Sequence, residues 1–70
     1  MEQLARFFQN QWQMKTTLPN GNELSTVQLP NRQYESCWFY ANNTSEVVAV
    51  YRGREEAVAG HTQLLQQAAG

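Results

Sequence analysis

Residues 34–65 read YESCWFYANNTSEVVAVYRGREEAVAGHTQLL, and this stretch decides the fold of the chain. An apolar run over 34–41 meets the polar segment 42–45, and a valine-rich run then leads to Tyr51. Asparagine tolerates a left-handed backbone, so the polar segment predicts a tight turn between two antiparallel strands, 34–41 and 46–51. After Gly53 the apolar spacing becomes helical. The stretch therefore predicts a strand, a turn, a strand and a helix.

The helix is expected over residues 54–68. Gly53 stands where an N-cap would, and Glu56 at the third helical position can fold back on that cap, near the positive end of the helix dipole. An apolar stripe that should pack on the sheet comprises Ala57, Val58, His61, Leu64, Leu65 and Ala68. Gly60 costs about 1 kcal/mol relative to alanine in mid-helix. We therefore expect helix and sheet backbones to approach closely at Gly60.

The first half of the chain predicts two further strands, residues 13–18 and 23–29, joined by the turn sequence Pro19-Asn20-Gly21-Asn22. Along the second of them, Leu24, Thr26 and Gln28 face one way and Ser25, Val27 and Leu29 the other. No internal repeat is evident. Leu4, Phe7, Phe8 and Trp12 fall at helical spacing, which predicts either a short N-terminal helix or an irregular arm over residues 1–11.

Together these elements predict one α+β domain over residues 1–70. Its antiparallel sheet, a meander of three or four strands, lies within residues 12–51, and the helix 54–68 packs across one face. A chain of 70 residues buries only about 60% of its unfolded surface, so the core must be small. A marginal core is often completed against a second copy, and we expect homodimerisation on that ground.

Composition narrows the function classes. The lone cysteine, Cys37, allows no intramolecular disulfide, and with His61 it supplies too few ligands for a zinc site, so neither a metal nor a cofactor is expected. A single cysteine in a strand is typical of a reducing compartment, which favours the cytoplasm. The apolar run 37–41 is too short to span a membrane, and residues 1–6 do not resemble a signal peptide. Five Lys and Arg against six Asp and Glu give a net charge of −1, which disfavours duplex nucleic acid as a partner.

The strand 34–41 carries large apolar groups on both faces. One face bears Tyr34, Ser36, Trp38 and Tyr40, and the other bears Glu35, Cys37, Phe39 and Ala41. Aromatic sheet faces can stack single-stranded bases, but the cations form no sequence cluster for a phosphate backbone. Core packing or a protein interface is therefore favoured. The candidate interface comprises Tyr34, Trp38, Tyr40, Phe7, Phe8 and Trp12, of which the last three could instead cover the face within the chain.

Two sets of residues suggest chemistry. Cys37 and His61 could form a thiol nucleophile and its base, yet no orienting Asn or Asp and no oxyanion loop is recognisable. His61 on the helix stripe is better explained as a core residue that hydrogen-bonds a strand group. Glu35 and Glu46 could form a carboxylate pair, but solvated rim positions are the more ordinary reading. No catalytic residue is predicted.

Several of these motifs occur together in a known family. Leu24-Ser25-Thr26-Val27, the strand Tyr34-Glu35-Ser36-Cys37-Trp38-Phe39, and Glu55-Glu56-Ala57 followed by Gly60-His61 resemble a family of small uncharacterised phage and prophage proteins. The resemblance covers about residues 24–65; the chain departs from it at Gly53, where the family tends to have Thr, and in the shorter connection 30–32. It implies a phage origin but no activity, so no catalytic residue is carried over.

The sequence thus predicts a non-enzymatic, phage-derived protein in the bacterial host cytoplasm. It would act by binding a host or phage protein, as an inhibitor of a host factor or of defence, or as a virion or regulatory accessory. Two alternatives stay open: a single-stranded nucleic-acid binder using the aromatic face, and a thiol enzyme using Cys37 and His61.

Overall fold

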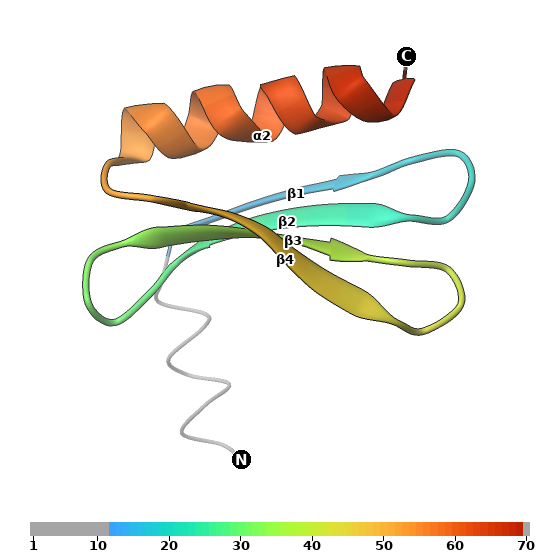
Figure 1. The fold of residues 1–70 in the computed structure, drawn as a ribbon, viewed down its shortest axis with the longest axis horizontal. Coiled ribbons are helices and arrows are strands. Elements are labelled where there is room, and N and C mark those ends of the chain that lie inside the picture. The colour runs from blue at the N-terminus through green and yellow to red at the C-terminus, as the bar shows by residue number, and fades with distance from the viewer. Residues whose placement is uncertain (1–11, 70) are drawn as a thin grey trace.

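The structure is a computed structural model that describes residues 12–69. Four strands come first, β1 (Gln13–Thr17), β2 (Glu23–Gln28), β3 (Tyr34–Phe39) and β4 (Ser45–Tyr51), and one helix follows, α2 (Arg54–Ala69). The strands form a single antiparallel sheet in the order β1-β2-β3-β4, which is a meander. Helix α2 crosses one face of that sheet and contacts β2, β3 and β4 (Figure 1). The predicted α+β architecture is confirmed; the expectations for residues 1–11 lie outside the described residues.

The three strand connections are copies of one turn. Each begins eleven residues after the last, at Leu18, Leu29 and Tyr40. In each, the amide of the fourth residue donates to the carbonyl of the first at 3.0 Å, and the amide of the first donates to the carbonyl of the fifth at 2.7–2.8 Å. This pattern is that of a type I turn followed by a residue in the left-handed region. The chain therefore contains an eleven-residue repeat of strand plus turn, which corrects the expectation that it has no internal repeat.

The asparagine at the third position explains why this turn recurs. In the three turns Asn20, Asn31 and Asn42 each accept, through Oδ1, the amide of the residue two positions on, at 3.0–3.1 Å. The fourth position then needs a positive φ, and it is occupied by Gly21 (φ 91°), Arg32 (φ 69°) and Asn43 (φ 70°). Because Tyr40 belongs to the closing turn, β3 ends at Phe39, two residues before the predicted end.

The core lies between the sheet and α2. Its buried apolar side chains are Leu24, Tyr34, Trp38 and Ala57. Thr26, Ser36 and His61 are buried among them, so almost half of this small core is polar. Every buried side-chain nitrogen and oxygen in the described residues has a hydrogen-bond partner, which keeps such a core from being costly.

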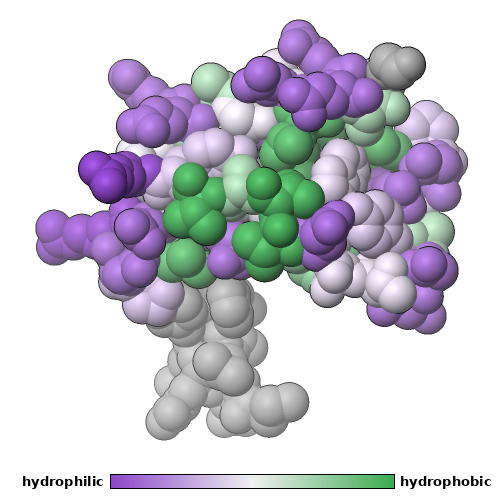
Figure 2. All heavy atoms as spheres, in the orientation of Figure 1, coloured by the Kyte–Doolittle hydropathy of each residue, from purple (hydrophilic) through white to green (hydrophobic). Residues whose placement is uncertain are grey.

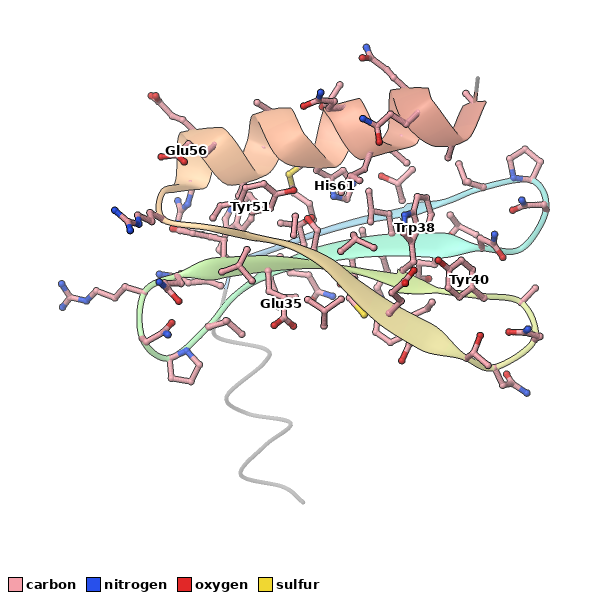
Figure 3. The ribbon with its side chains drawn as sticks, in the orientation of Figure 1. Glu35, Trp38, Tyr40, Tyr51, Glu56 and His61 are labelled. Atoms are coloured by element: carbon pink, nitrogen blue, oxygen red, sulfur yellow. The ribbon has the colours of Figure 1, made fainter. Side chains whose placement is uncertain are left out.

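The start of α2 agrees with prediction. The Gly53 carbonyl accepts the Ala57 amide at 3.0 Å, so Gly53 is the N-cap, and the Glu56 carboxylate lies beside it (Figure 3). Along the predicted stripe Ala57 and His61 are buried and Leu64 and Leu65 are half-buried, whereas Val58 and Ala68 are exposed.

The expectation for Gly60 needs a correction. A Cβ built on Gly60 would overlap the ring of Tyr51, the last residue of β4. The helix thus approaches a tyrosine side chain here, and the glycine makes room for the ring rather than for a strand backbone.

The fourth strand departs from simple alternation. Ala49 pairs with Ser36 but Val47 pairs with Cys37, so Val48 is an extra residue in β4, a β-bulge. Regular alternation would place Val47 and Ala49 on one face, but the bulge places them on opposite faces. Beyond the bulge, Val50 pairs with Glu35 and Tyr51 with Tyr34.

Candidate functional site

The face beneath α2 is the interior of the protein. Tyr34 and Trp38 are only 6% and 8% exposed, and Trp12 packs edge-on against Tyr34 with ring centroids 5.5 Å apart. The guanidinium of Arg54 lies 5.3 Å from the centroid of the Trp12 ring, which places a cation over an aromatic face. The proposed interface residues Tyr34 and Trp38 are therefore core residues, because α2 packs on the more aromatic face of β3. Phe7 and Phe8 lie outside the described residues.

This burial also bears on single-stranded nucleic acid. Bases can stack only on rings that solvent reaches, and of the three aromatic side chains that residues 34–41 place on this face only Tyr40 is half-exposed. Its hydroxyl donates to Glu46 Oε1 at 2.8 Å, and this bond to a carboxylate raises the pKa of Tyr40. The aromatic stacking platform considered for this face is thus absent from the described surface.

A small groove opens where Trp38 and Tyr40 reach the end of α2. Their rings stack at 6.4 Å with an interplanar angle of 19°. The groove, about 340 Å³, is lined by Leu18, Asn20, Asn22, Trp38, Tyr40, Leu64, Gln67 and Ala68. Its rim consists of neutral amides, and Asn22 Oδ1 is already bound to the Ala41 amide at 3.0 Å.

His61 is the centre of a buried chain of hydroxyl groups. Its Nε2 lies 3.0 Å from Thr16 Oγ1, and its Nδ1 lies 2.7 Å from Thr26 Oγ1 (Figure 3). Thr26 Oγ1 is in turn 2.6 Å from Ser36 Oγ, and Ser36 donates to the Tyr51 hydroxyl at 3.2 Å. The network ties α2 to all four strands and confirms the structural role predicted for His61.

The direction of the last bond orients the whole network. Because Ser36 gives its proton to Tyr51, it must accept from Thr26, and Thr26 must then accept from His61. We therefore assign the neutral Nδ1–H tautomer to His61, with Nε2 accepting from Thr16. Burial lowers the pKa of His61, which keeps the ring neutral. A general base must reach a substrate proton, and both nitrogens of this ring are already occupied inside the core.

The chemical pairs weighed in the sequence do not form. His61 lies under α2, whereas the alternation of β3 places Cys37 on the opposite face, so the sheet separates the thiol from the imidazole. Glu35 pairs with Val50 on that opposite face, and Glu46 pairs with Trp38 on the helix side. Within residues 12–69 no three His, Cys, Asp or Glu side chains gather as a metal site.

The second face of the sheet, which we call the open face, is left uncovered by α2. Cross-strand pairing arranges it in three rows, namely Thr17-Glu23-Phe39-Ser45, Lys15-Ser25-Cys37-Val47 and Gln13-Val27-Glu35-Val50. The residues that β1 contributes to the rows are all polar, and the apolar side chains Phe39, Val47 and Val50 lie toward β4. Phe39, Val47 and Val50 are 45%, 55% and 56% exposed. Figure 2 shows hydrophobic side chains gathered on the molecular surface where β4 runs.

A groove of about 360 Å³ lies beside this apolar cluster. Its floor includes Ser25, which its taller neighbours leave only 6% exposed, and the half-buried Cys37. Its polar rim holds an ion pair, Lys15 Nζ to Glu23 Oε2 at 3.8 Å, and Glu35. One cation against two carboxylates makes the groove unsuited to a phosphate backbone.

Sequence reasoning missed the open-face residues as a site. Phe39 was placed on the correct face of β3, but attention went to the face with more aromatic rings. The signal that could have found the site is a rule of packing, since a single amphipathic helix covers one face and takes the more apolar one. Large apolar residues that alternate with the covered residues along the same strands then lie on the other face and remain exposed.

Comparison with protein-family models, with curated proteins and with solved structures found no match to this chain. In the described part of the chain, no helix is long and apolar enough to cross a membrane.

Proposed function

We propose that this protein acts without catalysis, by binding another protein through the open face of its sheet. The observation that carries the proposal is the cluster of Phe39, Val47 and Val50, three large apolar side chains about half exposed on a face that α2 leaves free. Protein interfaces combine an apolar centre with a polar rim. Lys15, Glu23 and Glu35 supply such a rim around the adjoining groove.

The origin and location that we propose for the protein rest on the sequence. The resemblance of residues 24–65 to small phage and prophage proteins supports a phage origin, and the lone Cys37 supports the reducing cytoplasm of a bacterial host. The partner would then be a protein of that host or of the phage. An inhibitor of a host factor or of defence, or a virion or regulatory accessory, would fit this reading.

Affinity capture from bacterial lysate tests the proposal when it compares matched variants. Phe39→Glu places a charge within the apolar cluster, and Val58→Glu places the same charge on α2, where Val58 is 39% exposed. A protein captured by the wild type and by Val58→Glu, but lost with Phe39→Glu, supports the open face as the binding surface. Equal capture by all three, with circular dichroism showing all three folded, refutes it.

A further inference from the structure

The outer edge of β4 is open in the described structure. β4 is the last strand of the sheet order and, with seven residues, the longest of the four. It contains no proline and no lysine, the residues that commonly protect an edge strand from pairing. The other edge, β1, has five residues and carries Lys15.

The hydrogen-bond pattern shows which groups of β4 point outward. The bond from the Tyr40 amide to the Thr44 carbonyl closes the β3–β4 turn. Paired residues alternate between bonded and non-bonded positions from there, so Val47, opposite Cys37, turns its amide and carbonyl away from β3.

The other end of β4 can be located in the same way. The Leu29 amide donates to the Gln33 carbonyl, so alternation directs the backbone of Glu35 to β2 and not to β4. Val50, opposite Glu35, therefore also turns its amide and carbonyl outward. Both valines have their side chains on the open face, and both are more than half exposed.

The bulge decides which partner strand fits this edge. Val47 and Val50 are three residues apart, whereas outward positions of a regular strand are two apart. A regular partner strand could therefore pair with Val47 or with Val50, but its outward groups would not match both. A second β4 running antiparallel about a two-fold axis carries the same extra residue at the matching point, so Val47 meets the second copy's Val50 and Val50 meets its Val47.

Charge favours the same arrangement. Glu46 is the one charged residue of β4 and stands near its start. In this register it lies opposite Tyr51 of the second copy, whereas parallel pairing would set the two glutamates side by side. On the open face the seam brings together four valines, and β-branched cross-strand pairs stabilise a sheet.

From this geometry we infer that β4 is a self-pairing edge at which a second copy of the chain adds, forming a continuous eight-stranded antiparallel sheet with both helices on one side. The two apolar clusters become neighbours across the seam. The inference does not depend on the proposed function, because the seam rests on the outward backbone groups of β4, whereas the binding proposal rests on exposed side chains of the open face. Val47 and Val50 belong to both, and Phe39 belongs to the binding proposal alone.

Sedimentation analysis of charged variants tests whether Val47 and Val50 of two copies meet at a seam. Val47→Lys with Val50→Lys opposes lysines across the seam, and Val47→Glu with Val50→Glu opposes glutamates. We expect each double variant alone to be monomeric, and an equimolar mixture to form the mixed dimer because every lysine then faces a glutamate. A wild-type chain that remains monomeric up to about 1 mM, roughly the Kd of a very weak complex, or a mixture that stays monomeric while both variants are folded, overturns the inference.

A backbone variant separates edge pairing from stacking of two open faces. Val50→Pro removes an outward amide and no bond to β3, and Val50→Thr keeps both the amide and the branched side chain. We expect Val50→Pro to weaken dimerisation about tenfold or more, since each dimer loses two hydrogen bonds, with Val50→Thr close to wild type. A folded Val50→Pro chain that dimerises as well as Val50→Thr contradicts the seam.

Discussion

At the residue scale, His61 is the polar side chain whose hydrogen-bond network links α2 to all four strands. Its ring is 1% exposed and bonds Thr16 of β1 and Thr26 of β2, and through Thr26 it reaches Ser36 of β3 and Tyr51 of β4. Such a network is valuable only while each group is satisfied. The protonation state of one imidazole therefore influences all four strands.

Stability should consequently fall in mild acid. Burial lowers the pKa of His61 below its ordinary 6.5, so the unfolded chain binds the proton more readily than the folded chain. The contribution of the neutral ring is complete above pH 6.5 and is lost as the pH falls below that value toward the folded pKa. Urea unfolding at a series of pH values from 8 to 5 should show the free energy of unfolding declining. His61→Gln should be less stable at pH 8 and should lack this part of the decline; an unchanged slope would show that other groups cause it.

Gly60 offers a second prediction at this scale. In an unhindered helix interior Gly→Ala stabilises by about 1 kcal/mol, but here the added methyl would overlap the Tyr51 ring. We expect Gly60→Ala to destabilise the fold by about 1–3 kcal/mol, as overpacking does. In a Tyr51→Leu background the same change should become neutral or stabilising. Thermal unfolding of the four chains measures both effects, and a stabilised Gly60→Ala single variant would contradict this account of the glycine.

At the scale of the elements, the repeated turn sets the register of the sheet. Each turn uses the same asparagine bond and the same left-handed fourth position, so β2, β3 and β4, which each follow a turn, begin at intervals of eleven residues. A one-residue slip would move Leu24 and Trp38 to the open face. The turns therefore help to determine which side chains lie beneath α2.

Of the three turns, the one between β2 and β3 should be the easiest to stabilise by a single substitution. Arg32 holds a φ of 69°, a conformation that costs an ordinary residue about 1 kcal/mol and glycine almost nothing. We expect Arg32→Gly to raise the free energy of unfolding by about 0.5–1 kcal/mol. Gly21→Ala, at the equivalent position with φ 91° and with Ala41 Cβ 3.2 Å from the added methyl, should lower it. Urea unfolding compares the two, and stabilisation by both changes would refute the shared geometry.

How far sequence predicts such a chain depends on which forces act locally. Strand alternation, turn asparagines and the Gly53 cap are local, and they predict four strands and one helix to within a residue or two. The bulge at Val48 was not predictable from the Val-Val-Ala-Val run, because it depends on pairing with Ser36 and Cys37. The sequence also could not predict which face of the sheet the helix covers. Both faces of β3 carry large apolar side chains, and only the position of α2 distinguishes them.

At the scale of the whole molecule, the protein is a two-layer structure in which α2 covers one face of the sheet and leaves the other uncovered. Beneath α2, Tyr34 and Trp38 complete a core; on the open face, Phe39 and its valine neighbours have no cover among the described residues. Contiguous exposed apolar patches often mark interaction surfaces. The proposed binding surface follows from this asymmetry, and the inferred seam would bring the apolar clusters of two copies together.

Trp38 and Phe39 are neighbours in β3 that the account assigns to opposite roles, so comparing their replacement is its most direct test. Equilibrium urea unfolding followed by circular dichroism should show that Trp38→Ala loses about 3–5 kcal/mol, or fails to fold, because it empties the core. Phe39→Ala should stay folded within about 1 kcal/mol of wild type, since its ring is 45% exposed. A Phe39→Ala chain that unfolds as readily as Trp38→Ala, or a Trp38→Ala chain as stable as wild type, would contradict the assignment of the two faces.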